Sequence, residues 1–218
     1  MSSRTNLIFK QEDDETLKSN GEQPKVMARP MIPALDALEA ALRPLDALWL
    51  VGGSTGLLLQ GVALSAQPRD LDIYVDRNDA CGVHSALTAY AKDEQAESET
   101  AIYRSVLSHY DMDGVHVELV GGFEVRAYDS EYRVEAQYLA SRFERTYTLG
   151  NGRIVRLMPL VHELIFNVLR ERPDRYEAIA AACRREGREA QLAGLADLMN
   201  RNRFDERLRR RLFALLES

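Results

Sequence analysis

The sequence lacks several features that would place it in a specialised class of protein. No apolar run approaches the roughly 20 residues that a membrane-spanning helix needs, and the first residues lack the apolar segment of a secretory signal peptide. The two cysteines, Cys81 and Cys183, are far apart in patterns typical of helices, which favours reduced, partly buried thiols over a disulfide or a metal clip. The sequence also contains no internal repeat and no low-complexity segment. These absences predict a cytoplasmic protein that does not enter a membrane.

The composition that is present is that of an ordinary globular protein. Of 218 residues, 45% are hydrophobic and 28% are charged, which is enough to bury a substantial core. The net charge of −6 is unevenly distributed, because residues 1–141 carry 12 Lys and Arg against 23 Asp and Glu, whereas residues 142–218 carry 16 against 11. Two interpretations stay open: an acidic metal-binding part opposed by a basic part that holds phosphates, or a solvated arginine-rich helical surface.

Hydrophobic periodicity predicts an α/β (α+β) protein with a mixed sheet, flanking helices and a C-terminal helical region. We expect a disordered polar tail over residues 1–28, a core over 29–157 and helices over 158–218. Strands are predicted at 47–51, 71–75, 102–110, 115–120, 145–149 and 153–157, a loop at 92–100, and helices at 33–45, 54–60, 78–91, 160–169, 175–185, 189–199 and 204–216.

Gly52, Gly53 and Ser54 form a turn between the first predicted strand and the helix that follows it. Glycine has no Cβ and adopts turn dihedrals closed to other residues, so the backbone can approach a ligand closely here. The amide groups at the helix start and the Ser54 hydroxyl favour an anion such as phosphate. Taken alone, such a turn is more often a structural helix cap.

Three carboxylates follow this turn on predicted strands. Asp70 and Asp72 are two residues apart, so their side chains leave the same face of a strand. Glu118 projects from the polar face of the strand at 115–120, and it would complete the group if the two strands are neighbours. Such a cluster can hold a hard divalent cation such as Mg²⁺, and one member can act as a base. A polar strand face turned to solvent is the simpler alternative for Asp70 and Asp72 alone.

These residues resemble the nucleotidyltransferases of the polymerase β-like superfamily, in particular the small bacterial branch of minimal and aminoglycoside nucleotidyltransferases and abortive-infection toxins. The family's Gly-Gly-Ser turn corresponds to Gly52, Gly53 and Ser54. Its Asp-x-Asp strand corresponds to Asp70 and Asp72, and its later acidic residue to Glu118. The resemblance covers residues 45 to 122 and extends more loosely to the helix at 160–169.

The resemblance implies the transfer of a nucleoside monophosphate from a nucleoside triphosphate, such as ATP, to a hydroxyl acceptor. Asp70, Asp72 and Glu118 would be metal ligands for Mg²⁺, with two ions expected, and Glu118 could instead be the base. Gly52, Gly53 and Ser54 would bind the triphosphate. The acceptor could be a small molecule, a tRNA or a protein.

The chain departs from the family in two places. The interval from Ser54 to Asp70 is longer than usual, and Asn167 and Arg175 stand about where many relatives carry a lysine and an aspartate. Arg170 and Arg172 could replace that lysine, although long arginine side chains are usually solvated. A catalytically inactive module that binds a nucleotide or a protein is therefore the alternative function.

The remaining polar features give weaker signals. His116 shares the polar face of Glu118 and could contact the site, although a hydrogen-bonded strand histidine is the simpler interpretation. The other histidines show no ligand spacing, so the sequence predicts no zinc site. The helix at 204–216 places leucines opposite arginines, which indicates an amphipathic helix packed on the core, with nucleic-acid binding through its basic face as the alternative.

Overall fold

The computed structural model describes residues 31–217, and the tail predicted at 1–28 lies outside them. The helices are α1 (Met31–Leu42), α2 (Gly53–Leu59), α3 (Ala80–Leu87), α4 (Ala136–Phe143), α5 (Leu160–Leu169), α6 (Pro173–Arg201) and α7 (Glu206–Glu217), with a short 3-10 turn η1 (Thr88–Tyr90) after α3. The strands are β1 (Trp49–Gly52), β2 (Asp70–Val75), β3 (Ala96–Glu99), β4 (Tyr103–Met112), β5 (Val115–Ala127), β6 (Ser130–Arg133), β7 (Thr146–Thr148) and β8 (Ile154–Arg156). Within the described range, no helix combines the length and apolarity needed to cross a membrane.

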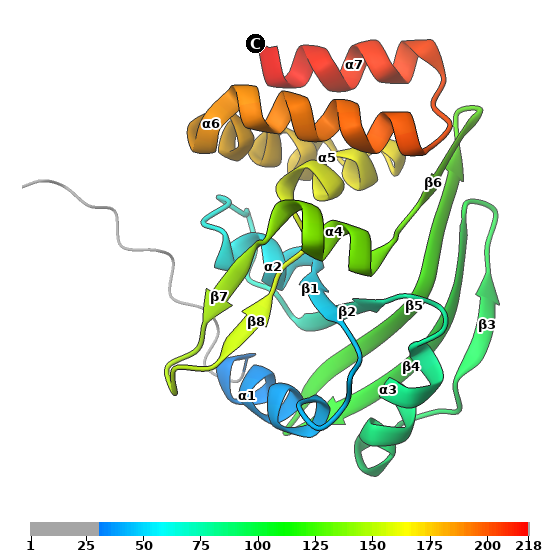
Figure 1. Ribbon diagram of the computed structural model, residues 1–218, viewed down its shortest axis with the longest axis vertical. Coiled ribbons are helices and arrows are strands. Elements are labelled where there is room, and N and C mark those ends of the chain that lie inside the picture. The colour runs from blue at the N-terminus through cyan, green and yellow to red at the C-terminus, as the bar shows by residue number, and fades with distance from the viewer. Residues whose placement is uncertain (1–30, 218) are drawn as a thin grey trace, which may run out of the picture.

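The strands form one mixed sheet and one separate hairpin. The main sheet has the order β1-β2-β5-β4-β3, with β6 paired to the far end of β5. In this sheet β2 and β5 run parallel, and the other strand pairs are antiparallel. Strands β7 and β8 form the separate hairpin, which projects from the side of the molecule in Figure 1. The predicted mixed α/β fold is therefore confirmed.

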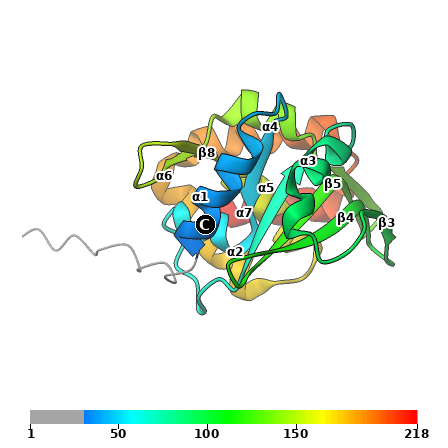
Figure 2. The same cartoon turned by 90° about the horizontal axis from the view of Figure 1, so that it is seen from below.

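Helices cover both faces of the sheet. On one face α1 and α3 lie side by side, as the view from below shows (Figure 2), and they bury side chains such as Leu35 and Val83 against Leu71, Ile73 and Leu119. On the other face α5, α6 and α7 are gathered at one end of the molecule (Figure 1). They share a second apolar core with sheet residues that include Tyr74, Val120 and Phe123.

This arrangement decides which strand residues reach the candidate site. Asp72 and Tyr74 alternate with the buried Leu71 and Ile73 along β2, so they point to the face that carries α5. Toward α5 this face is apolar, and toward the start of β2 it carries carboxylates. The site therefore lies on the sheet face beside the C-terminal helices.

Most predicted elements are confirmed, and three are wrong or missing. Residues 92–100 were expected to be a loop, but they contain β3, which pairs with β4 at the sheet edge. The prediction also omitted β6 and α4. The two helices expected at 175–185 and 189–199 lie within α6, where the backbone is non-helical at Gly187 with φ of 130°.

The cysteine prediction is confirmed for the free thiols and wrong for their partial burial. Both thiols are free, so there is no disulfide between Cys81 and Cys183. Cys183 is buried in α6, as expected of an apolar helical position, whereas Cys81 on α3 is exposed rather than partly buried.

Candidate active site

The parallel pairing of β2 and β5 brings the predicted carboxylates together. Asp72 is the register partner of Glu118, and Asp70 is the partner of His116. Since side chains alternate along each strand, all four project from the same face of the sheet. The neighbouring position that the sequence required for Glu118 is therefore present.

The Gly-Gly-Ser turn lies directly against Asp72. Gly53 has a positive φ of 59°, and a Cβ at this position would overlap the Asp72 carboxylate. A Cβ on Gly52 would lie 2.6 Å from a ring carbon of Tyr74. The two glycines are thus needed for the turn to approach β2 so closely.

A carboxylate that the sequence did not identify supports the turn. Glu163 of α5 is buried, and its Oε1 accepts a 2.8 Å hydrogen bond from the backbone amide of Gly53. The amide group of Asn167, one turn further along α5, donates to the Glu163 carbonyl oxygen at 2.8 Å and to Oε2 at 3.3 Å. Glu163 therefore occupies the Gly53 amide that was expected to face a phosphate.

Negative charge accumulates around this turn. Burial raises the pKa of Asp72 to about 7, and the neighbouring charges of Asp70, Glu118 and Glu163 act in the same direction. Burial likewise raises the pKa of Glu163 to about 7, against the opposing effects of the Gly53 hydrogen bond and of nearby arginines. The cluster is electrostatically unfavourable when its members are ionised, a condition that a bound cation would relieve.

Arginines lie opposite the carboxylates. Arg175 of α6 donates a 2.8 Å hydrogen bond from Nη1 to the Ser54 hydroxyl oxygen. Arg170, which follows α5, contributes positive charge near Asp72. Burial together with the positive charges of Arg172 and Arg170 lowers the pKa of Arg175, so Arg175 lies in a partly desolvated basic environment.

The two arginines considered as replacements for a lysine differ in their environments. Arg172 forms a two-pronged ion pair with Asp174, with distances of 2.9 Å and 2.8 Å, at the exposed start of α6. Arg170 lines the cavity beside Asp72 and also covers the ring of Phe166, with its guanidinium carbon 4.8 Å from the ring centre. Arg170 and Arg175 are therefore the cations best placed to meet an anionic ligand.

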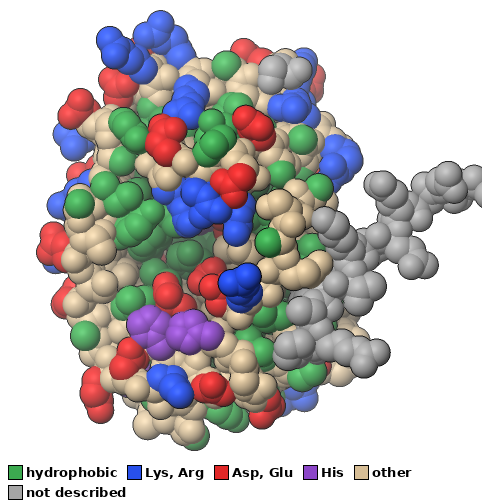
Figure 3. Space-filling model, turned by 180° about the vertical axis from the view of Figure 1, so that it is seen from behind, with side chains coloured by type: hydrophobic (Ala, Val, Ile, Leu, Met, Phe, Trp, Pro, Cys, Tyr) green, Lys and Arg blue, Asp and Glu red, His purple; other side chains and the backbone are tan. Residues whose placement is uncertain are grey.

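A cavity of about 280 Å³ lies beside Asp72, Glu118 and Arg170. It is lined by Gly53, Asp72, Tyr74, Ser98, Thr100, Tyr103, Ser105, Leu107, Glu118, Val120, Phe123, Phe166 and Arg170. Figure 3 shows this side of the molecule, where acidic, basic and histidine side chains surround a hollow whose floor is largely hydrophobic. The cavity thus combines a charged end with an apolar wall, as many small-molecule sites do.

Part of the cavity wall comes from the segment that was predicted to be a loop. Ser98 of β3 and the adjacent Thr100 supply hydroxyl groups opposite the aromatic residues. Tyr103 and Phe123 supply aromatic rings whose centres are 5.7 Å apart. The signal for β3 was weak because its sequence, Ala-Glu-Ser-Glu, has no hydrophobic alternation.

The comparisons with known proteins identify the fold. No protein-family model and no curated protein sequence matches the chain. A candidate nucleotidyltransferase from Thermotoga maritima, TM1012, superposes with a TM-score of 0.57 at 20% identity, over 71% of this chain and 92% of that one. The antibiotic-resistance factor ANT(2")-Ia, in complex with adenylyl-2"-tobramycin, gives a TM-score of 0.48 at 13% identity, over 79% of this chain and 98% of that one. The first of these likenesses shows that the chain has the nucleotidyltransferase fold.

Proposed function

We propose that this chain is a Mg²⁺-dependent nucleotidyltransferase that moves a nucleoside monophosphate from a nucleoside triphosphate to a hydroxyl acceptor. The observation that carries this proposal is the register pairing of Asp72 with Glu118 against the Gly53 turn. Arg170 and Arg175 provide positive charge beside the same cavity. Carboxylates and arginines so arranged suit a triphosphate with its cation.

The donor set fits Mg²⁺. Asp70, Asp72 and Glu118 offer only carboxylate oxygens, which are the ligands that this ion prefers. Burial, and after it the repulsion of the neighbouring carboxylates, raises the pKa of Asp72, and a bound cation would stabilise the ionised carboxylates against both effects. Bound Mg²⁺ would neutralise phosphate charge and favour the in-line displacement.

The chain's own residues would position and deprotonate the reactants. The acceptor hydroxyl oxygen attacks the α-phosphorus and forms a new P–O bond, while the bond to the bridging oxygen of the β-phosphate breaks and pyrophosphate leaves with that electron pair. Glu118 is partly exposed at the cavity, where it can serve as the third Mg²⁺ ligand or instead take the hydroxyl proton as the base. Ser54, Arg170 and Arg175 would hold the triphosphate, while Gly52 and Gly53 keep the turn close to Asp72.

The cavity suits a nucleoside. Its aromatic residues Tyr103, Phe123 and Phe166 provide an apolar wall for a base, and the hydroxyls of Ser98 and Ser105 can exchange hydrogen bonds with it. The acceptor classes predicted from the resemblance, a small molecule, a tRNA or a protein, all carry the required hydroxyl. The arginines of α7 add little support for RNA, because Arg210 pairs with Glu206 and Arg211 with Glu171.

The test begins with thermal unfolding in the presence of Mg²⁺ and each nucleoside triphosphate. The proposal expects stabilisation that requires both metal and nucleotide and that disappears in the double variant Asp70→Asn/Asp72→Asn. Incubation with α-labelled nucleotides and either total tRNA or pooled small hydroxyl compounds should then give a labelled acceptor and pyrophosphate. Nucleotide binding without transfer to any acceptor would favour the inactive binding module, and no stabilisation by any nucleotide would contradict the proposal.

A further inference from the structure

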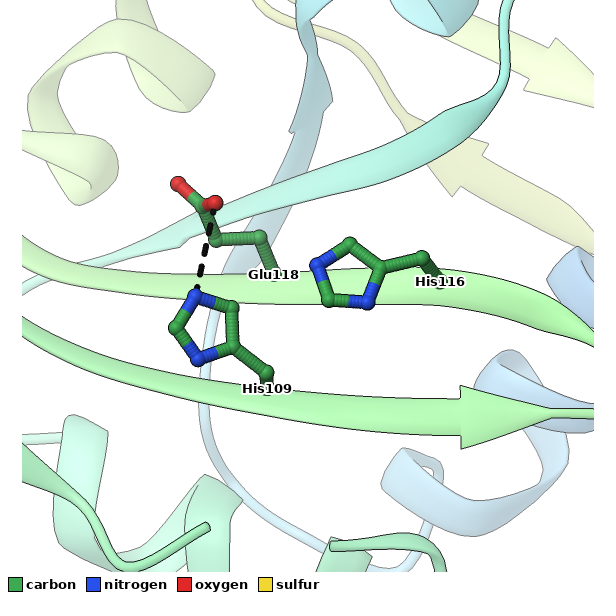
Figure 4. Close-up of side chains that lie close together, drawn as sticks. All are labelled: His109, His116 and Glu118. Carbon is green, nitrogen blue, oxygen red and sulfur yellow. Dashed lines mark ion pairs between the residues drawn. The ribbon is translucent and has the colours of Figure 1, made fainter. Parts of the chain in front are cut away.

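A second group of potential metal ligands lies at the edge of the carboxylate cluster. His109 of β4 is the antiparallel register partner of Glu118, and His116 precedes Glu118 by two residues on β5. The three side chains project from the same side of the β4–β5 hairpin (Figure 4). One potential ligand atom from each residue lies within 4.8 Å of the other two.

The orientation of His109 is fixed by a carboxylate behind it. Asp93 accepts a 2.5 Å hydrogen bond from Nδ1 of His109 through Oδ2, and a 2.8 Å hydrogen bond from the His109 backbone amide through Oδ1. An ionised carboxylate only accepts hydrogen bonds, so the Nδ1 atom carries the proton. In a neutral ring, the lone pair then resides on Nε2.

That lone pair faces another acceptor. Nε2 of His109 is 3.7 Å from Oε2 of Glu118, the contact drawn as a dashed line in Figure 4. Two acceptors that face each other repel unless a proton or a metal cation lies between them. A histidine whose second nitrogen donates to a carboxylate is also the usual arrangement of a metal ligand, because the carboxylate sets the tautomer and strengthens the ligand.

His116 adds a third potential donor atom. Its ring stacks on that of His109, with centres 5.3 Å apart and planes inclined by 20°. The side chain is exposed, and those of His109 and Glu118 are 29% and 35% exposed, so a cation can reach the group from solvent. Figure 3 shows a continuous patch of histidine side chains beside acidic side chains on this face of the molecule.

We propose that His109, His116 and Glu118 bind a transition-metal cation of the zinc class, with Asp93 as the residue that positions His109. Two imidazoles and one carboxylate form a known zinc-binding set with a fourth position open to water. Imidazole nitrogen suits zinc and its neighbours, whereas Mg²⁺ and Ca²⁺ prefer oxygen. In a tetrahedral site the ligand atoms are roughly 3.3 Å apart, as zinc–ligand bonds of about 2.0 to 2.1 Å require, so side-chain rotations must draw this group together by roughly 1.5 Å at most.

The proposed zinc-class site differs from the Mg²⁺ site in its ligand chemistry and shares only Glu118 with it. Binding of a zinc-class ion to these side chains does not require nucleotide transfer. A failure to bind Zn²⁺ would therefore not contradict the proposed activity, and a lack of nucleotidyl transfer would not contradict the Zn²⁺ site.

The experiment is a titration of the tag-free full chain with ZnCl₂ in the absence of nucleotide, followed by calorimetry or equilibrium dialysis. We expect one Zn²⁺ per chain at this site, with binding that millimolar Mg²⁺ does not displace. His109→Gln and His116→Gln should each weaken Zn²⁺ binding by roughly tenfold or more, and Asp93→Asn by roughly tenfold, as for residues that support a metal ligand. Circular dichroism and thermal unfolding would establish that each variant is folded.

His84→Gln provides the matched control. His84 lies on α3, bonds through Nδ1 to the Tyr110 hydroxyl, and does not belong to the group of three ligands. The proposal expects wild-type Zn²⁺ affinity in this variant. Equal Zn²⁺ affinity in wild type, His109→Gln and His116→Gln would overturn the proposed site and leave the contacts of Asp93, His109 and Glu118 as an ion-pair network. A loss of Zn²⁺ affinity in His84→Gln as large as that in the two ligand variants would also contradict the proposal.

Discussion

The backbone amide of Gly53 donates its hydrogen bond to the side chain of Glu163, which is 110 residues further along the chain. The bond joins the first sheet-to-helix turn to the first helix of the C-terminal group. Because Glu163 is buried, this contact between α5 and the turn holds the turn against Asp72. The geometry of the candidate active site therefore depends on α5 as well as on the sheet.

The ionisation of Glu163 should make stability depend on pH. Burial raises its pKa from 4.5 to about 7, so between these values the folded protein binds more protons than the unfolded chain. The free energy of unfolding should consequently fall as pH rises through this window and level off above it. Glu163→Gln can still accept the hydrogen bond from Gly53 but does not ionise, so its free energy of unfolding should not show this fall. Between pH 4 and pH 8, the stability of the variant should therefore rise by about 3 kcal/mol relative to that of wild type.

Urea unfolding of metal-free protein across this pH range would measure the difference. Glu177→Gln, an exposed substitution on α6, serves as the control and should follow the wild-type curve. If the curves of wild type and Glu163→Gln stay parallel, the pKa of Glu163 is the same in the folded protein and in the unfolded chain, and the assignment is wrong.

Gly53→Ala should lower the free energy of unfolding by more than backbone strain alone would cause. The residue has a positive φ, which costs about 1 to 2 kcal/mol for alanine, and the new Cβ would also displace the Asp72 carboxylate. We expect a loss of about 2 to 4 kcal/mol in stability and loss of Mg²⁺-dependent nucleotide binding. Gly61→Ala isolates the strain, because Gly61 has φ of 72° and a Cβ added there would have no atom within 4 Å. Equal stability losses in the two variants would show that the contact with Asp72 has no energetic role.

The shared face of Asp70 and Asp72 could be predicted from the sequence because it follows from strand periodicity alone, whereas Glu118 joins them only through the pairing of β2 with β5. Residues two apart on a strand share a face, so Asp70 and Asp72 belong together once β2 is recognised. The position of His109 could also have been found. Asp113 and Gly114 have the positive φ values of a two-residue hairpin turn, and counting back from that turn places His109 opposite Glu118.

The role of Glu163 and the presence of α4 depend on contacts between distant residues, which no local sequence pattern reveals. Glu163 lies in a helix made mostly of apolar residues, and only the folded structure shows that its side chain reaches Gly53. Helix α4 begins where Asp76, 60 residues earlier, accepts hydrogen bonds from the amides of Ala136 and Gln137 at 2.7 Å and 3.1 Å. A cap supplied from a distant loop leaves no capping residue in the local sequence, which explains why the helix was missed.

Asp72→Asn should stabilise the metal-free protein and impair its proposed function. Burial and the charges of Asp70, Glu118 and Glu163 disfavour the ionised Asp72 side chain, so the neutral isostere should raise the free energy of unfolding at pH 8 by on the order of 2 kcal/mol. Loss of a metal ligand should at the same time reduce nucleotidyl transfer roughly a hundredfold or more. Thermal unfolding in EDTA and pyrophosphate release with Mg²⁺ measure the two effects. Asp113→Asn, at the exposed hairpin tip, should change neither.

Arg175→Gln should weaken the binding of a nucleoside triphosphate with little effect on folding. Arg175 bonds to Ser54 and lies close to two other arginines, so its removal takes away a charged donor to the phosphates. A charge-assisted hydrogen bond contributes about 1.5 to 3 kcal/mol, which corresponds to a rise in Kd of roughly tenfold to a hundredfold. Calorimetry with Mg²⁺ and a non-hydrolysable analogue would measure it. Arg172→Gln removes an arginine of the same segment that pairs with Asp174 at 2.9 Å and 2.8 Å, whereas Arg175 approaches Asp174 only to 3.9 Å. The Kd of Arg172→Gln should therefore stay within about twofold of wild type. Equal weakening in both variants would mean that general positive charge, rather than the contact at Ser54, attracts the triphosphate.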